Sequence, residues 1–250
     1  MPPDRDWLRP GPDELGPGVT AFMTTRGPNF GRKAGDPEQV RANRAGLAER
    51  LGARPVFLDQ VHGADVVRLR ADWHDDNAPR ADAAVSTDPE LAVAILVADC
   101  LPVLFAAPGG VAGAHAGWRG LAAGVLENTV AELCAATGCA PRDVKAWLGA
   151  CIGPEAFEVG PEVVRAFGRE ALACDQPGFL YRPNPEPRWR ADLGALARER
   201  LASVNVTQIS GGSWCTLTDD SRFFSFRGEA LGRPRGRMAA CIALGRGFGR

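Results

Sequence analysis

The middle of the chain constrains the fold most, because it holds three short segments that are almost entirely apolar. They are LAVAILV (Leu91–Val97), VLFAA (Val103–Ala107) and VAGAHA (Val111–Ala116). Residues that favour turns lie beside them at Thr87–Pro89 and Pro108–Gly110. A strand that is apolar on both of its faces is typical of a sheet covered on both sides. We therefore predict a buried sheet whose strands run through this region.

Further helices and strands are indicated by apolar spacing and by end signals. Asp36 caps a predicted helix that ends at Gly52. Three more segments predict helices over Gly120–Gly138, Pro161–Leu172 and Ala191–Ser203. The other predicted strands are Val19–Thr25, Pro55–Val61, Asp65–Leu69, Ala81–Ser86, VKAWLGA, VTQIS and RMAACIAL, and a proline-rich loop is predicted over Cys174–Arg188. This mixture predicts an α+β fold with mixed sheets.

Length and charge are those of one soluble domain, which we expect to span residues 1–250. Residues 1–18 are polar and rich in proline, so we expect a flexible or irregular segment there. A formal net charge of −1 gives no electrostatic reason to expect a nucleic acid or a membrane surface as partner. The longest apolar stretch, Leu91–Ala98, is too short to span a bilayer.

Cysteine usage bears on the cellular compartment. The 7 cysteines are an odd number, none forms a CxxC pair, and the start of the chain has no apolar run that would act as a signal peptide. We therefore expect reduced, mostly buried thiols and a cytoplasmic location.

Three residues in glycine-flanked turns carry the clearest chemistry. His62 lies in DQVHG, Cys100 in ADCLPV and His115 in AGAHAGWRG. One thiolate and two imidazoles form a ligand set that suits zinc and leaves a fourth tetrahedral position open. Their wide spacing would bring ligands together from separate strand ends, which fits a catalytic site better than a structural zinc knuckle. The plain alternative is two incidental histidines and a buried thiol.

The segment after His115 predicts an anion site. Gly117 and Gly120 flank Trp118 and Arg119 just before the predicted long helix. Such a turn presents backbone N–H groups at the positive end of a helix, and an arginine adds donors matched to phosphate. The alternative interpretation is that Arg119 pairs with a surface carboxylate while the glycines only shape the turn.

These motifs resemble the YfiH-like or laccase-domain family, also named peptidoglycan editing factor or polyphenol oxidase, whose members include zinc-dependent purine nucleoside phosphorylases. The resemblance runs from about Val19 to Leu244 and continues in GACIGPEAFEVG, ADL, WCT, FFSFR and RGRMA. It implies a single layered domain with mixed β-sheets inside and helices outside. It also implies that His62, Cys100 and His115 bind zinc, with copper possible at the same site.

Other residues are weaker candidates. Asp99 precedes Cys100 and would transfer a proton or orient a ligand histidine, unless it only caps the backbone. Arg119 is the second catalytic candidate. Gln60 and Arg227 are candidate substrate-binding residues because they lie inside family motifs. Arg26 is a third, although this chain departs from the family pattern after it by shortening the following loop.

Asp82, in the ADA segment, is a weaker candidate still.

The resemblance implies a purine nucleoside phosphorylase that cleaves adenosine, inosine or methylthioadenosine with phosphate, with a possible adenosine deaminase activity. Its partners would be the nucleoside and inorganic phosphate, and no protein partner is implied. A copper-dependent polyphenol oxidase is one alternative, but a laccase needs a histidine-rich multicopper cluster. The chain has only His62, His74 and His115. A hydrolase that uses Cys100 as a nucleophile in peptidoglycan precursor editing is another alternative.

Overall fold

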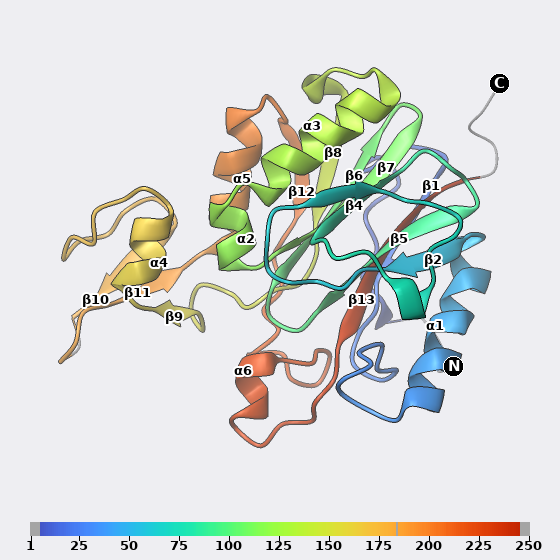
Figure 1. Cartoon of the computed structure of the whole chain (residues 1–250). Helices are drawn as coiled ribbons and strands as arrows, with labels where there is room; N and C mark the ends of the chain where they lie inside the picture. The colour runs from blue at the N-terminus through green and yellow to red at the C-terminus, as the bar shows by residue number, and fades with distance from the viewer. Residues whose placement is uncertain (1–5, 184, 246–250) are drawn as a thin grey trace.

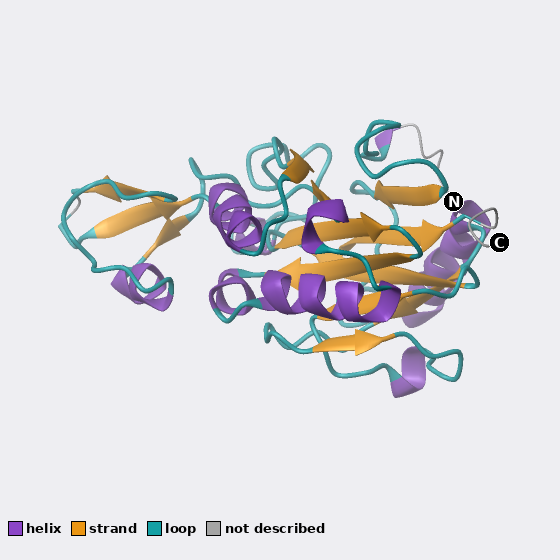
Figure 2. Ribbon diagram, turned by 90° about the horizontal axis from the view of Figure 1, so that it is seen from above, coloured by secondary structure: helices purple, strands orange, loops and turns teal. Residues whose placement is uncertain are grey.

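The computed structural model describes residues 6–183 and 185–245, in which two sheets pack face to face and helices cover their outer faces (Figure 1, Figure 2). The first sheet has the strand order β1-β13-β5-β2. Its strands are β1 (Val19–Met23), β2 (Arg54–Phe57), β5 (Leu91–Val97) and β13 (Met238–Leu244). Strands β2 and β5 are parallel, and the other two pairs are antiparallel. The predicted mixed sheet is therefore confirmed.

The second sheet has the order β12-β8-β6-β7-β4-β3. Its strands are β3 (Val66–Arg68), β4 (Ala83–Ser86), β6 (Leu101–Ala107), β7 (Gly110–Ala116), β8 (Lys145–Leu148) and β12 (Gln208–Gly211). It is also mixed, because β3 is parallel to β4 and β12 is parallel to β8. The central hairpin of β6 and β7 is antiparallel, and Pro102 lies opposite His115.

The core between the sheets explains why the central strands are apolar on both faces. Val93 and Ile95 from the first sheet pack with Leu104 and Val111 from the second. The two sheets approach closely at Gly113 on β7, because a Cβ there would come within 2.9 Å of Val93 Cγ1. The opposite faces of both sheets are covered by helices, so the central strands are buried on both of their faces.

Most of the outer helices begin and end near the residues that the sequence predicts. Helix α1 (Pro37–Leu51) covers the first sheet, is capped by Asp36, and ends at Gly52 in the left-handed conformation with φ 66°. Helices α3 (Val125–Thr137) and α5 (Leu193–Ser203) cover the second sheet. Layers of helix, sheet, sheet and helix result, which confirms the predicted arrangement of sheets inside and helices outside.

The prediction of a single helix over Gly120–Gly138 was wrong. The chain forms a short helix α2 (Trp118–Ala122) and then α3, with Gly124 between them at φ 91°. A left-handed residue cannot continue a right-handed helix, so the glycine separates the two.

The proline-rich loop predicted over Cys174–Arg188 was also wrong in part. It contains β10 (Phe179–Arg182), which pairs with β11 (Arg188–Ala191), and β11 pairs with β9 (Glu158–Val159). Buried Phe179 and Trp189 anchor this small sheet.

Together with α4 (Pro161–Ala166), the small sheet projects from the main body in both ribbon views. Helix α4 is shorter than predicted, because Gly168 adopts φ 71° soon after its end.

The remaining described segments are short. Helix α6 (Phe226–Glu229) precedes β13, and 3-10 helices span Asp75–Asn77 and Pro141–Asp143. Near the N-terminus, Trp7 and Leu8 are buried, and Leu8 forms a bridge with Met23. Residues 1–5 of the predicted irregular segment lie outside the described residues. Within the described part of the chain, none of the helices has the length and apolar character needed to cross a membrane.

The contact at Gly113 predicts a stability defect. In Gly113→Ala the new methyl group would meet Val93 and Ile95 across the two sheets. We expect a loss of ~1–3 kcal/mol in the free energy of unfolding, measured by urea denaturation. Val93→Ala in the same chain should relieve the overlap, so the double variant should lose less than the sum of the two single losses. Additive losses would contradict the close packing of the sheets.

Candidate metal centre

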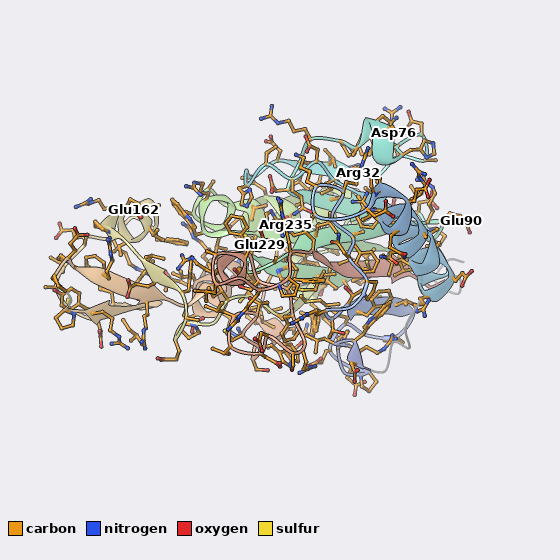
Figure 3. The ribbon with its side chains drawn as sticks, turned by 90° about the horizontal axis from the view of Figure 1, so that it is seen from below. Arg32, Asp76, Glu90, Glu162, Glu229 and Arg235 are labelled. Atoms are coloured by element: carbon orange, nitrogen blue, oxygen red, sulfur yellow. The ribbon has the colours of Figure 1, made fainter. Side chains whose placement is uncertain are left out.

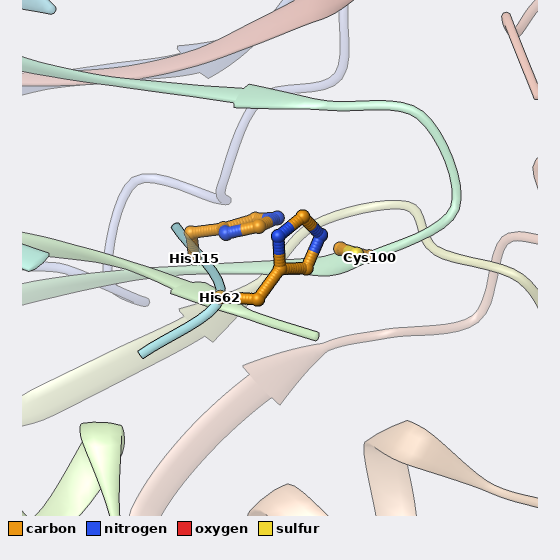
Figure 4. Close-up of side chains that lie close together, drawn as sticks. All are labelled: His62, Cys100 and His115. Carbon is orange, nitrogen blue, oxygen red and sulfur yellow. The ribbon is translucent and has the colours of Figure 1, made fainter. Parts of the chain in front are cut away.

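The predicted ligands lie where the chain crosses from one sheet to the other. His62 lies in the loop after β2, and Cys100 lies in the turn that joins β5 of the first sheet to β6 of the second. His115 lies near the end of β7, beside the start of β6. Figure 4 shows the three side chains converging. The fold thus brings together three segments that the sequence leaves far apart.

The geometry of these side chains fits a metal ion. One ligand atom from each residue lies within 4.8 Å of the others. The imidazole rings of His62 and His115 have centroids 4.8 Å apart and an interplanar angle of 72°. Zinc bonds of ~2.0–2.3 Å place tetrahedral ligand atoms roughly 3.3–3.7 Å apart, so the side chains would draw together by up to about 1 Å around the ion. His115 is buried and His62 is exposed, so the side of the cluster nearest His62 faces solvent and offers an open position.

Asp82, a weak candidate from the sequence, holds two of the predicted ligands in place. Its fully buried carboxylate accepts hydrogen bonds from the backbone N–H groups of Val61, His62 and Gly63, at 3.1, 2.9 and 2.7 Å. The same carboxylate lies 2.8 Å from Nδ1 of His115. A proton on Nδ1 leaves Nε2 of His115 free to bind a metal. These contacts come from segments far apart in sequence, so no local motif indicates them.

The carboxylate also stabilises an uncommon backbone conformation. His62 has φ 62°, in the left-handed region that residues other than glycine rarely adopt. Its N–H and those of its two neighbours converge on Asp82, which compensates for the strained conformation.

The glycines of the GWRG turn are needed for close packing around the ligands. A Cβ on Gly117 would lie 3.0 Å from Cys100 Sγ and 3.1 Å from His62 Cδ2. A Cβ on Gly120 would lie 2.5 Å from the carbonyl oxygen of Gly63. Both glycines therefore let α2 pack against the ligand loop. Helix α2 spans only Trp118–Ala122, so its dipole is weaker than that of the predicted long helix.

The ionisation of Cys100 and His115 is linked. Burial acts to raise the pKa of the Cys100 thiol, but the charge and hydrogen bond of His115, helped by His62, outweigh burial and lower it to about 6. Burial acts to lower the pKa of His115, but the thiolate of Cys100 and the carboxylate of Asp82 raise it to about 9. Without metal, Cys100 and His115 therefore form a thiolate–imidazolium pair at pH values between about 6 and about 9. A thiolate is the form in which cysteine binds a metal.

Asp99 is occupied by contacts away from the ligand histidines. Its carboxylate accepts hydrogen bonds from the hydroxyls of Thr216 and Ser225, at 2.5 and 3.0 Å, and from the N–H of Arg227 at 2.7 Å. Among the described residues, the hydrogen bond to a ligand histidine comes from Asp82 and not from Asp99. Asp99 therefore fastens the start of α6 to the turn that carries Cys100.

The three ligands open into a cavity of about 980 Å³. Seven arginine and lysine side chains line it, namely Arg32, Lys33, Arg44, Arg119, Arg227, Arg235 and Arg237. Some of these carry carboxylate partners, such as Arg32 with Asp76 and Arg235 with Glu229 (Figure 3). Arg119 is exposed, and its guanidinium carbon lies 4.3 Å from the centroid of the Trp118 ring. No ion pair involves Arg119 in the described part of the chain, so its donors remain available to an anion.

The other substrate candidates differ in position. Arg227 lines the cavity, and its guanidinium donates to the carbonyl of Glu158 at 3.3 Å. Gln60 also lines the cavity, but its side-chain amide is already paired with Leu96. Its nitrogen donates to the Leu96 carbonyl and its oxygen accepts from the Leu96 N–H, both at 2.8 Å. Arg26 is absent from the lining and donates to the carbonyl of Asp220. Part of the shortened loop after Arg26, residues 31–34, forms one side of the cavity.

Known proteins resemble the chain over nearly its whole length. The family described as "Multi-copper polyphenol oxidoreductase laccase" matches residues 18–245. The Escherichia coli (strain K12) protein named "Purine nucleoside phosphorylase YfiH" is 46% identical over 221 residues, which cover 86% of each chain. A Xylella fastidiosa (strain 9a5c) protein named "Purine nucleoside phosphorylase" is 41% identical and covers 96% of this chain and 95% of its own.

Solved structures share the fold. The crystal structure of YlmD from Geobacillus stearothermophilus has a TM-score of 0.85 and 30% identity, and the match covers 98% of both chains. The crystal structure of a Neisseria meningitidis protein has a TM-score of 0.82 and 36% identity, and it covers 96% of this chain and 100% of its own.

The contacts of Asp82 predict a defect in metal binding. Asp82→Asn replaces one acceptor oxygen with a donor that faces backbone N–H groups and the ring of His115. We expect zinc affinity to fall roughly 10- to 100-fold, measured by competition with a chromogenic chelator. Asp65→Asn is the matched control, because Asp65 is exposed and lies outside the cavity lining. Wild-type affinity in Asp82→Asn would show that the carboxylate does not hold the ligands.

The linked ionisation predicts an unusual thiol titration. In metal-free protein, the thiolate absorbance that disappears in Cys100→Ser should titrate with a midpoint near pH 6, below the ordinary value of 9.0. The pKa is depressed, so the thiolate persists above this midpoint and is lost as the pH falls through it. His115→Gln removes the main stabilising charge and should move the midpoint upward. An unchanged midpoint in that variant would rule out the ion pair.

Proposed function

The chain belongs to the family described as multi-copper polyphenol oxidoreductase laccase, and we propose that it is a zinc-dependent purine nucleoside phosphorylase. The proposal takes its reaction from relatives that bear this name at 46% and 41% identity. Its substrates would be adenosine, inosine or methylthioadenosine, together with inorganic phosphate.

One observation carries the proposal: a ligand cluster with an open side lies in the same cavity as an arginine without a carboxylate partner in the described part of the chain. The cavity, at about 980 Å³, is large enough for a nucleoside and a phosphate ion. Arg119 follows the metal ligand His115 by a few residues and belongs to the turn that packs on the ligand loop. An anion held by Arg119 would therefore lie beside the metal ligands.

Phosphorolysis depends mainly on positioning. A guanidinium fork binds two phosphate oxygens and can direct a third toward the ribose carbon that bears the base. Arg119 would supply this fork, and Arg227, on the same cavity, would add positive charge. His62, Cys100 and His115 would hold the zinc ion, with Asp82 fixing the tautomer of His115. When bound, zinc supplies a Lewis acid that polarises a substrate oxygen or nitrogen and makes water more acidic. This chemistry would also support the adenosine deaminase activity that the resemblance implies.

The thiolate–imidazolium pair supports a second candidate, a cysteine hydrolase. A thiol whose pKa is about 6 beside a histidine has the ionisation that a nucleophilic cysteine requires. The peptidoglycan-editing role implied for some relatives would use such a nucleophile. Zinc on Cys100 would occupy the thiolate, so one zinc per chain, lost in Cys100→Ala, favours the phosphorylase. Full hydrolytic activity in metal-free protein favours the hydrolase.

A multicopper oxidase is the least favoured candidate. Its oxygen-reducing cluster needs many imidazoles, but the chain has 3 histidines. His74 is exposed beside the 3-10 helix at Asp75–Asn77 and is not part of the ligand cluster. Copper bound by the same three ligands would form one centre. Sustained oxygen consumption by copper-loaded protein, abolished by His62→Ala, would restore this candidate.

The position of Arg119 predicts a phosphate-specific defect. Wild-type protein should cleave adenosine or inosine only when phosphate is present and should release ribose 1-phosphate. Arg119→Ala should raise the KM for phosphate roughly 10- to 100-fold, because a hydrogen-bonded charge pair is lost, with a smaller effect on the KM for the nucleoside. The KM of Arg119→Lys for phosphate should lie between those of the wild-type protein and Arg119→Ala, because lysine keeps the charge but loses the fork of donors.

Arg142→Ala is the matched control, since that arginine is 82% exposed and lies outside the cavity lining. Cleavage at the same rate without phosphate, yielding free ribose, would identify a hydrolase instead.

A further inference from the structure

Phe226 is the unusual residue of the cavity. In the FFSF segment, Phe223 and Phe224 are 2% and 6% exposed and belong to the core between the sheets, whereas Phe226 is 61% exposed. Phe226 is nevertheless part of the cavity lining, together with the three metal ligands. A large aromatic ring left uncovered beside a polar cavity is a common sign of a binding surface.

The ring is held at a defined place relative to the metal ligands. Ser225 caps α6 by accepting from the N–H of Gly228 at 3.0 Å, and its hydroxyl donates to Asp99. The N–H of Arg227 donates to the same carboxylate oxygen at 2.7 Å. These bonds involve the residues on both sides of Phe226, and Asp99 directly precedes the ligand Cys100. The position of Phe226 is thus tied to that of the metal centre.

A fixed cation lies near the ring. The guanidinium carbon of Arg237 is 5.7 Å from the centroid of Phe226. Arg237 is itself held by Glu229 at 2.7 Å and by the carbonyl of Gly236 at 2.7 Å. The contact with a held cation restricts the ring, while most of the Phe226 surface stays uncovered. A preorganised ring with free surface suits the stacking of a flat π-system.

We propose that Phe226 is the stacking platform for the planar aromatic part of the ligand, which is the purine base if the proposed function holds. Stacking on an apolar ring does not read the exocyclic groups of a base. The platform therefore gives adenine and hypoxanthine nucleosides similar affinity, while Arg119 takes the anion. Asp99 acts as a positioning residue, because it fixes the segment that carries the ring.

The test measures binding directly, without phosphate and without turnover. In Phe226→Ala, the dissociation constants of adenosine and inosine, measured by calorimetry on zinc-loaded protein, should both rise roughly 5- to 100-fold. Binding of inorganic phosphate should stay unchanged, and Phe226→Tyr should restore most of the nucleoside affinity. Leu231→Ala is the matched control, because Leu231 is 67% exposed but lies outside the cavity lining.

The outcomes separate this proposal from the proposed function. Unchanged nucleoside binding in Phe226→Ala would overturn the platform, even if phosphorolysis is observed. A change of oligomeric state in that variant, with nucleoside binding intact, would also overturn it and would identify Phe226 as a contact between copies of the chain. Nucleoside binding that depends on Phe226, in protein that never cleaves the nucleoside, would support the platform and overturn only the phosphorylase. Absence of purine binding by wild-type protein would overturn both.

Discussion

The hydrogen bonds of the buried Asp82 carboxylate are the interactions on which the candidate metal centre depends. The carboxylate accepts hydrogen bonds from three successive N–H groups of the His62 loop and contacts the ring of His115. Burial acts to raise the pKa of Asp82, but the hydrogen bonds from His115 and the loop hold it below its ordinary value. The carboxylate therefore stays charged and keeps two ligands from different segments in one arrangement. Without it, the strained backbone at His62 would lose the three hydrogen bonds that hold it.

The two-sheet architecture places this carboxylate where the ligands can meet. Strand β5 belongs to one sheet and β6 to the other, so the turn between them, with Cys100, lies at the junction of the sheets. The sheets approach closely at Gly113, and α2 approaches the ligand loop closely at Gly117 and Gly120. Small residues at these points let rigid, doubly covered strands support a compact ligand cluster. The ligand cluster is thus supported from one side by the buried core, while His62 lies on the exposed side.

The cavity wall repeatedly pairs an arginine with an aromatic ring. Such pairs are Arg44 with Phe57, Arg119 with Trp118, Arg227 with Phe157, and Arg237 with Phe226. Stacking restricts each guanidinium, and Arg44, Arg227 and Arg237 also donate to protein oxygens, which fixes their positive charge on the wall. A wall of this kind favours a ligand that combines a flat ring with an anion, as a nucleoside with phosphate does. The proposed stacking of the base on Phe226 and the proposed binding of phosphate by Arg119 would both use this wall.

The sequence by itself determined the features that depend on residue type and local order. Apolar segments and caps gave the central strands and α1, and His62, Cys100 and His115 stood out because few residue types bind zinc. Only the tertiary structure decided the role of Asp82, the place of Asp99 away from the histidines, and the exposure of Phe226 beside the metal cavity. It also decided the break at Gly124 and the β10–β11 pairing. Each of these depends on contacts between segments or on a backbone angle, and neither leaves a periodic signal in the order of residues along the chain.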